Sequence, residues 1–352
     1  MMNLLQLEKM PGHQSMLIFH ALARMGFEGL VIVSPQKPLA SVGFFQDAVK
    51  EVDLDNCRRL GIPVMRREVG GGATYLDGNQ VFYQIIWQKG NPRFPTRIKD
   101  IFPFLSQPVC ETYRDFGIET KFRPENDIVT KEERKIAGEG GGDIGDSMAF
   151  VGGILMDFDY ATMSKILKVP DEKFRDKIYK SMEENLTMMK RETGIMPKRE
   201  DVVRSLIHHY ESLLGKLKPI RLTQDVVDKM IELERWFTSD EFLFKKTPRV
   251  PTGVKIREGV EILYGTYKAR GGLIRTVQEV RNEVIQDIGI SGDFQFYPKS
   301  ELVGLEKNLQ NIKRKENVII SKVEDFYQKQ KVESPGVEPE DVTDAIMEAK
   351  SV

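Results

Sequence analysis

Hydrophobic residues follow two alternating patterns along roughly the first 160 positions of the chain. Short apolar runs rich in β-branched and aromatic residues, bounded by Gly, Pro, Asn or Asp, are typical of β-strands. The predicted strands are residues 29–33, 80–87 and 153–158. Apolar residues at helical spacing between them predict helices over residues 13–23, 49–60 and 104–115. The alternation indicates a mixed α/β domain.

A helical pattern dominates from Pro170 onward. Apolar residues recur at helical spacing over residues 174–189 and again over 203–214, which predicts two helices. A third helix is expected after Thr223, because a threonine hydroxyl suits the N-cap position. We expect this helical block to pack against the preceding sheet.

A proline-containing segment, residues 245–251, divides the chain. Its two prolines lie close together and block both a helix and a central strand, so the segment predicts a linker. The elements predicted after it are a strand pair over 253–268, a strand over 273–281 and a helix over 301–309. The polar residues beyond Lys329 predict a loose tail with one short helix after Pro339. The predicted parts are a domain over 1–250, a small α+β domain over 252–330 and a flexible tail over 331–352.

The composition is that of an ordinary globular protein, with 40% hydrophobic and 30% charged residues. A formal net charge of −1 gives no field that draws the chain to nucleic acid or to an anionic membrane, so we expect neither partner. Cys57 and Cys110 have no metal-ligand spacing and form no disulfide framework, which favours a reducing compartment. The chain shows no signal-peptide pattern and no run of about 18 apolar residues, so we expect a cytoplasmic protein.

The first candidate site is the segment of residues 66–77. Its glycine triplet, Gly70–Gly72, lets the backbone take positive φ and approach a ligand closely, and a run of such amides forms an anion site. The neighbouring Arg66 and Arg67 can hold phosphate oxygens in a bidentate fork. A glycine turn in a hairpin, with both arginines solvated, fits the spacing equally well.

The second candidate site begins at Asn126 and Asp127 and continues through a glycine-rich stretch, residues 134–145. The small residues of this stretch predict a loop, and Lys135 lies just before it, where it can place one positive charge on an acyl-phosphate oxygen. Such a fixed cation stabilises the charge that builds on the equatorial oxygens when a carboxylate attacks an α-phosphate. Taken alone, Lys135 fits a surface lysine before a flexible loop better. Together with the first segment, it favours a phosphate-handling site.

The two segments together resemble the signatures of the lipoate–protein ligase family, which has a biotin/lipoyl ligase and class II synthetase-like fold. The first signature is an arginine pair, a glycine triplet and an aspartate, here Arg66, Arg67, Gly70, Gly71, Gly72 and Asp77. The second is an Asn-Asp pair and a Lys-Ile-Ser-Gly block, here Asn126, Asp127, Lys135, Ile136, Ala137 and Gly138. The resemblance extends through most of residues 1–250, and the chain after residue 252 looks like the family's accessory domain.

The resemblance implies a largely antiparallel mixed sheet flanked by helices, with a small C-terminal α+β domain. It implies an enzyme that joins lipoic acid, or a similar acyl acid, to a lysine of a lipoyl-domain or glycine-cleavage-H-like carrier protein. ATP with Mg²⁺ activates the acid as an acyl-adenylate, and the accessory domain is chiefly needed for that step. Lys135 is then the catalytic residue.

The implied binding residues come from both signatures. They are Arg66, Arg67, Gly70, Gly71, Gly72, Thr74, Tyr75, Asn126, Asp127 and Gly138. Asp77 would support the glycine turn, and the position of any metal ligands stays open. The chain departs from the family pattern at Leu76 and Val151, which replace histidines, and at Glu139 and Gly140, which replace a Ser-Ala pair. These departures leave the identity of the acyl substrate open.

Two other functions remain open. An ATP-independent acyltransferase that moves octanoyl or lipoyl groups between carriers would need a nucleophile, such as the cysteine of related acyltransferases, or direct amine attack. Neither cysteine lies next to the two segments in the sequence, which argues against it. A non-catalytic module that binds a lipoyl domain would not need Lys135 or the glycine triplet. A biotin ligase is disfavoured because the chain has no Gly-Arg-Gly-Arg-type loop.

Overall fold

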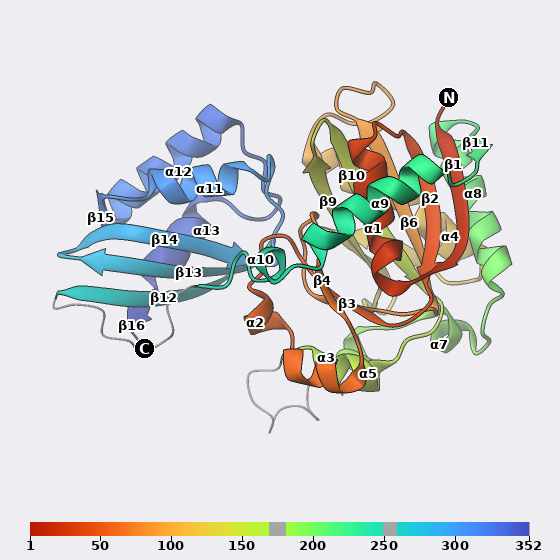
Figure 1. The fold of residues 1–352 in the computed structure, drawn as a ribbon, viewed down its shortest axis with the longest axis horizontal. Coiled ribbons are helices and arrows are strands. Elements are labelled where there is room, and N and C mark those ends of the chain that lie inside the picture. Colours follow the sequence, from red (N-terminus) through yellow and green to blue (C-terminus); the bar gives the residue numbers. More distant parts are fainter. Residues whose placement is uncertain (169–180, 249–258, 352) are drawn as a thin grey trace.

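The computed structural model describes residues 1–168, 181–248 and 259–351, which form two units (Figure 1). The larger unit is built around an eight-stranded sheet and the smaller one around a five-stranded sheet. The predicted mixed α/β fold, with a largely antiparallel sheet and an extra C-terminal sheet domain, is confirmed. No helix among the described residues is both long enough and apolar enough to cross a membrane.

The eight-stranded sheet positions both candidate segments. Its strands, in the order in which they lie side by side, are β11 (Lys218–Ile220), β1 (Asn3–Met10), β2 (Gly29–Pro35), β6 (Gln80–Gln88), β10 (Ser147–Leu155), β9 (Lys135–Ile144), β8 (Asp127–Thr130) and β7 (Thr120–Arg123). β1 runs parallel to β2 and to β11, and all other neighbours are antiparallel.

Two helices cover each face of this sheet. One pair is α1 (Gly12–Arg24) and α9 (Gln224–Phe237), and the other is α4 (Ile98–Asp115) and α8 (Arg199–Leu214). Successive strand residues point to opposite faces. In β6, Phe82 therefore packs in the core beside α1 and α9, whereas Tyr83 packs in the core beside α4 and α8. The cavity described below is lined from the α1 side.

A second, three-stranded sheet lies beside the first. Its strands are β3 (Leu39–Val42), β4 (Val64–Arg66) and β5 (Thr74–Leu76). The short helices labelled in the larger unit are α2 (Ala48–Glu51), α3 (Leu54–Leu60), α5 (Tyr160–Ile166), α7 (Met189–Thr193) and α10 (Asp240–Leu243). The helix predicted over 49–60 is split in two, because Asp53 caps α3 by accepting from the backbone N–H of Asn56. Of the helix predicted over 174–189, residues 174–180 lie outside the described residues; residues 181–185 are helical, and the helix is interrupted at residues 186–188.

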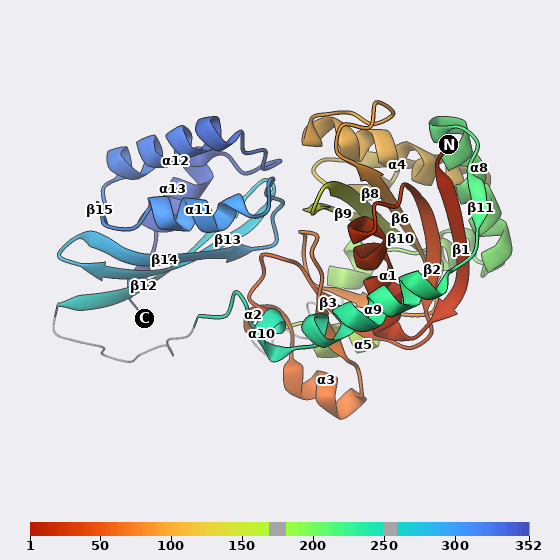
Figure 2. The ribbon, with the colours of Figure 1, turned by 45° about the horizontal axis from the view of Figure 1, so that its top comes forward.

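The smaller unit is an antiparallel sheet with helices on one side (Figure 2). The order of its strands is β15 (Ile312–Lys313), β14 (Val284–Gly292), β13 (Gly272–Arg281), β12 (Val260–Ala269) and β16 (Lys350–Ser351). Its helices are α11 (Glu301–Asn308), α12 (Glu316–Gln330) and α13 (Pro339–Met347). Of the strand pair predicted over 253–268, the described part is the single long strand β12. The start of that pair and the end of the predicted linker lie outside the described residues.

The prediction of a flexible tail after residue 330 is wrong. The α13 helix packs on β12 and β13 and buries Val342, Ala345 and Ile346, and β16 pairs with β12. The few apolar residues of the tail fall on one helical face, which average polarity conceals. The smaller unit therefore extends to residue 351.

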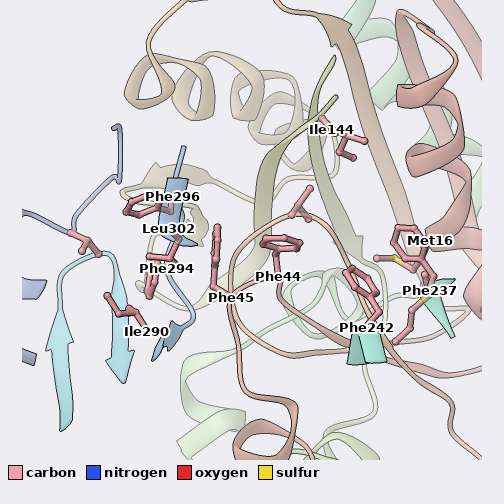
Figure 3. Close-up of a cluster of buried hydrophobic side chains, with 14 of the residues drawn as sticks. Met16, Phe44, Phe45, Ile144, Phe237, Phe242, Ile290, Phe294, Phe296 and Leu302 are labelled. Carbon is pink, nitrogen blue, oxygen red and sulfur yellow. The ribbon is translucent and has the colours of Figure 1, made fainter. Parts of the chain in front are cut away.

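Aromatic side chains join the two units (Figure 3). Phe45, which follows β3 and packs on Phe44, meets Phe294 and Phe296, which follow β14. The rings of Phe45 and Phe294 are stacked, with centroids 5.4 Å apart. Lys299 of the smaller unit also lies 3.3 Å from a carboxylate oxygen of Glu68, and both side chains are largely buried. One continuous hydrophobic cluster thus crosses the boundary between the units.

Candidate active site

A cavity of about 490 Å³ lies next to α1, between the large sheet and the small one. Its lining is mainly apolar and includes Met16, Phe19, Leu76, Phe82, Val151, Leu155, Phe158, Met163, Met182 and Leu186. Its lining residues with cationic or amide side chains are Arg67, Gln80, Gln84, Arg123, Asn126, Lys135 and Asn185. Such a cavity suits a ligand with a hydrocarbon body and an anionic group.

Both segments singled out in the sequence meet at this cavity, although they are far apart along the chain. The first segment contributes Arg67, Gly71, Gly72, Thr74 and Tyr75 to the lining, and the second contributes Asn126, Lys135 and Gly138. The remaining predicted residues, Arg66, Gly70, Asp77 and Asp127, do not line it. The alternative in which both arginines are solvated is wrong, since both side chains are buried.

Arg66 supports the fold and does not face the cavity. Its guanidinium donates to the backbone carbonyl oxygens of Gly43 and Phe44 and, from α10, of Phe242, at 2.8–2.9 Å. Burial lowers the pKa of Arg66 to about 10. Adjacent residues of an extended chain point to opposite sides, so only one of the two arginines can reach the cavity. The prediction that Arg66 binds substrate is not supported by its position.

Arg67 holds the glycine triplet in shape. Its Nη2 donates to the carbonyl oxygens of Gly70 and Gly72, at 2.9 and 2.8 Å. Gly71 between them has a φ of 91°, a conformation that glycine takes without strain. The N–H of Gly70 donates to Gly141 in β9, so this amide is already used within the protein. The triplet is a turn fixed by a buried cation, with Gly71 and Gly72 exposed to the cavity.

Lys135 reaches the cavity from the start of β9. Its Nζ lies 2.6 Å from Oδ1 of Asp127, whose other carboxylate oxygen accepts from Arg123 at 2.8 Å. Burial acts to raise the pKa of Asp127, but Lys135 and Arg123 outweigh it and lower the pKa below its usual value. Asp127 therefore stays ionised and fixes the ammonium group, which is the arrangement that a preorganised cation requires.

The glycine-rich stretch after Lys135 is the strand β9 and not the flexible loop predicted from its composition. Gly138 has a specific steric role in it. A Cβ atom on Gly138 would lie 2.9 Å from both Cε and Nζ of Lys135. The absence of a side chain at Gly138 thus leaves room for the lysine to cross the strand.

Asn126 and Asp77 fix local structure. The side-chain amide of Asn126 donates to the carbonyl oxygen of Glu139 at 2.7 Å, which ties the start of the second segment to β9. Asp77 accepts from the backbone N–H of Asn79, and burial raises its pKa. Asp77 therefore closes the turn between β5 and β6, and its hydrogen bond goes to that turn and not to the glycine triplet.

A buried carboxyl group, Glu139, lies on the α4 side of the sheet and was not predicted as functional. Tyr83 and Ser106 donate to its two oxygens at 2.8 and 2.5 Å. Gly152 lies between Tyr83 and Glu139 in the strand register, and a Cβ there would overlap the Tyr83 hydroxyl at 2.2 Å. Burial raises the pKa of Glu139 to about 8, against the opposing effect of both hydrogen bonds. The only indication in the sequence was that Glu139 departs from the family pattern.

Neither cysteine belongs to the cavity lining among the described residues. Cys57 is buried under the small sheet, and Cys110 lies in α4 on the opposite face of the large sheet. Burial raises the pKa of each thiol to about 11. Both thiols are therefore protonated near neutral pH and are poor nucleophiles. No group of three or more His, Cys, Asp or Glu side chains in the described ranges could hold a metal ion.

Residues 18–211 match the family model of the lipoyl protein ligase A/B catalytic domain. Lipoate-protein ligase A subunit 1 of Thermoplasma acidophilum is 30% identical over 213 residues, which are 55% of this chain and 79% of that protein. Octanoyltransferase LipM of Staphylococcus epidermidis is 23% identical over 233 residues, which are 58% of this chain and 83% of that protein. Relatives with two different activities thus each align with more than half of the chain.

Solved structures extend the comparison to the smaller unit. A chain from the archaeal lipoylation system of Thermoplasma acidophilum, a bi-partite lipoate protein ligase with its E2 lipoyl domain, has a TM-score of 0.62 at 26% identity. The alignment covers 71% of this chain and 99% of that one. LipL1 of P. falciparum in complex with lipoate has a TM-score of 0.69 at 18% identity, and covers 94% of this chain and 95% of its own. The likeness to LipL1 shows a shared fold that includes the C-terminal unit.

The fold and the cavity therefore define an enzyme of the lipoate ligase and transferase class. The protein belongs to the lipoate–protein ligase family.

Proposed function

We propose that the protein is an ATP-dependent lipoate–protein ligase that works in two steps. The carboxylate of lipoic acid, or of a similar acyl acid, attacks the α-phosphorus of ATP and releases pyrophosphate. The ε-amine of a carrier lysine then attacks the acyl carbonyl, loses a proton and releases AMP. The carrier is a lipoyl-domain or glycine-cleavage-H-like protein, and the reaction takes place in the cytoplasm.

The shape and the lining of the cavity support this substrate. Its apolar residues suit a medium-length acyl chain. Asn126 and Lys135 supply donors for the carboxylate and the phosphate, and Arg67, whose guanidinium already donates to Ser41, Gly70 and Gly72, adds its positive charge. Lys135 stabilises negative charge on the phosphate oxygens in the first step and on the leaving AMP in the second. Gly71 and Gly72 leave room for the acyl-adenylate at the edge of the turn. A putative lipoate protein ligase from T. acidophilum with bound lipoic acid and a lipoate-protein ligase A bound with ATP share the fold, both at 21% identity and with TM-scores of 0.57 and 0.58.

The observation that carries the choice of a ligase is the state of the two cysteines. An acyltransferase that works through a thioester needs a thiolate at the cavity. Cys57 and Cys110 are absent from the described lining and have raised pKa values, as reported above. Activation of the acid by ATP needs no thiol. The octanoyltransferase relatives are the reason to test the alternative directly.

Mg²⁺ would enter this site together with ATP. Because the described residues hold no cluster of carboxylates for a metal, phosphate oxygens and water would supply most of its ligands, as is usual for Mg²⁺ with nucleotides. The residues that line the cavity fit a Mg²⁺ ion that arrives bound to ATP. Its contribution is to neutralise phosphate charge, while Lys135 and Arg67 orient the reacting groups.

Release of pyrophosphate is the decisive measurement. The ligase proposal requires release that depends on both ATP and lipoate, before any carrier is added. The double variant Cys57→Ala/Cys110→Ala should keep this activity within about twofold of wild type. A trapped acyl-thioester in the wild type, together with loss of transfer in the double variant, would establish the transferase instead.

A further inference from the structure

The segment between β14 and α11 runs along the glycine triplet of the larger unit. The backbone N–H of Gly71 lies 3.5 Å from the carbonyl oxygen of Phe294. A Cβ on Gly70 would lie 2.6 Å from Oε1 of Gln295 and 2.8 Å from the same Phe294 oxygen. The smaller unit therefore touches the turn that borders the cavity. The close packing of Gln295 leaves no room for a side chain at Gly70. Figure 3 shows the aromatic neighbours that fix this segment.

Gln295 has a donor without a partner. Its side chain is 4% exposed, and its Oε1 accepts from the hydroxyl of Tyr297 at 3.2 Å. Its Nε2 is buried and has no hydrogen-bond partner in the part of the chain that the structure describes. Native proteins pair nearly all buried N–H groups with protein, water or ligand, so this unpaired donor is available to a partner from outside the chain.

Three side-chain donors converge on one glycine of the cavity. A Cβ placed on Gly71 would lie 3.2 Å from Nη2 of Arg67, 3.6 Å from Nε2 of Gln295 and 3.9 Å from Nδ2 of Asn126. Arg67 and Asn126 line the cavity together with Gly71. Arg67 and Asn126 already donate to the backbone carbonyl oxygens of Gly70, Gly72 and Glu139, so Gln295 supplies the donor that is still unused, beside the positive charge of Arg67. Nitrogen groups from three separate segments around one point favour an anionic oxygen there.

We propose that Gln295 is a substrate-binding residue that the smaller unit contributes to the active site. Its Nε2 donates to an oxygen of the bound acyl carboxylate or, once the adenylate has formed, to an oxygen of the acyl phosphate, next to Arg67 and Asn126. The assignment to the adenylate rests on the proposed function, whereas the assignment to the carboxylate does not. The site is then incomplete until the C-terminal unit has docked.

The test compares two variants that differ in what they remove. Gln295→Met keeps the volume but removes the donor, and Tyr297→Phe removes the hydroxyl that Gln295 accepts from but leaves Nε2 in place. Gln295→Met should weaken lipoate binding in calorimetry and slow pyrophosphate release by roughly 10- to 100-fold, the scale of losing one preorganised donor. Tyr297→Phe should stay within about threefold of wild type in both measurements.

A third variant covers the case in which Gln295→Met does not fold. Gln295→Glu keeps the size and the acceptor for Tyr297 but places a negative charge at the anion site, so it should weaken lipoate binding at least as strongly. Lipoate binding of wild-type strength in either folded Gln295 variant would overturn the proposal. So would an equal loss in Tyr297→Phe, because that result assigns Gln295 a packing role. A wild-type protein that binds lipoate but releases no pyrophosphate would refute the ligase activity alone, and the binding comparison would still decide the role of Gln295.

Discussion

The chain contains two glycine triplets, Gly70–Gly72 and Gly140–Gly142, which lie against each other but have opposite conformations. The first is a turn, where Gly71 has positive φ. The second lies within the extended strand β9, where none of the three has positive φ. The N–H of Gly70 donates to the carbonyl oxygen of Gly141 at 3.2 Å.

The two triplets therefore need glycine for different physical reasons. In the turn, the backbone angle of Gly71 excludes most side chains. In the strand, close packing excludes them: a Cβ on Gly142 would lie 2.9 Å from the carbonyl oxygen of Glu68, and one on Gly141 would lie 2.8 Å from the Tyr297 hydroxyl. Three consecutive glycines are thus required in the turn for the backbone conformation and in the strand for the close packing of neighbouring atoms.

Substitution in the turn should have the largest effect on activity. Gly71→Val forces a β-branched residue into positive φ and directs its side chain at Arg67, so adenylate formation should fall by at least about 100-fold. Gly90→Val is the matched control, since Gly90 has a φ of 87° but no atom within 4 Å of its Cβ position. Both variants should lose stability, but only Gly71→Val should lose pyrophosphate release. Equal activity in the two variants would show that the turn is not part of the active site.

The cation that precedes the second triplet should be next in importance. Lys135→Ala should reduce ligation by roughly 100-fold without unfolding the protein, because Lys135 is partly exposed and Asp127 keeps Arg123 as a partner. Lys131→Ala, in the exposed turn before β9, should leave the rate unchanged. Single-turnover transfer from synthetic lipoyl-AMP measures the second step separately. A wild-type rate in Lys135→Ala would refute the assignment of Lys135.

Substitution in the strand should cost stability more than chemistry. Gly142→Ala places a methyl group against the backbone of Glu68 and Val69, which cannot move like a flexible side chain, so the free energy of unfolding should fall by about 1–3 kcal/mol. Gly289→Ala in β14 is the control, because its Cβ position is open. Denaturant unfolding of both variants measures the difference. If Gly142→Ala is as stable as the control, close packing does not explain the second triplet.

The smallest expected effect concerns Glu139, next to the second triplet. Because its pKa is raised to about 8, the folded protein retains a proton that the unfolded chain releases above about pH 4.5. This stabilisation is fully present at low pH and is lost as pH rises through about 8. The midpoint temperature of thermal unfolding should therefore fall less between pH 6 and 8.5 for Glu139→Gln than for the wild type. The exposed Glu132→Gln should show the wild-type profile, and an identical profile in both variants would contradict a protonated Glu139.

Local patterns predicted most of the large unit correctly. The helical spacing of residues 104–115 and the β-branched run of 80–87 correspond to α4 and β6, because one face of α4 and both faces of β6 pack on a core. The resemblance that paired Lys135 with the glycine triplet agrees with their meeting at one cavity. The stretch after Lys135 was predicted as a loop because glycine disfavours strands locally, and only contacts across the fold make it one. Arg66 was misassigned because sequence adjacency does not show which of two neighbours faces inward. Gln295 was missed because its position depends on docking of the smaller unit.

The continuous aromatic cluster between the units has a consequence for how the chain can be divided. If the chain were cut before residue 259, the ring of Phe45 that Phe294 and Phe296 cover would meet water. Exposed apolar patches of this kind promote self-association. In the intact chain the peptide tether keeps the two faces at an effective concentration on the order of millimolar, so docking does not depend on how much protein is present. Dilution of the protein therefore does not separate the two units at the active site.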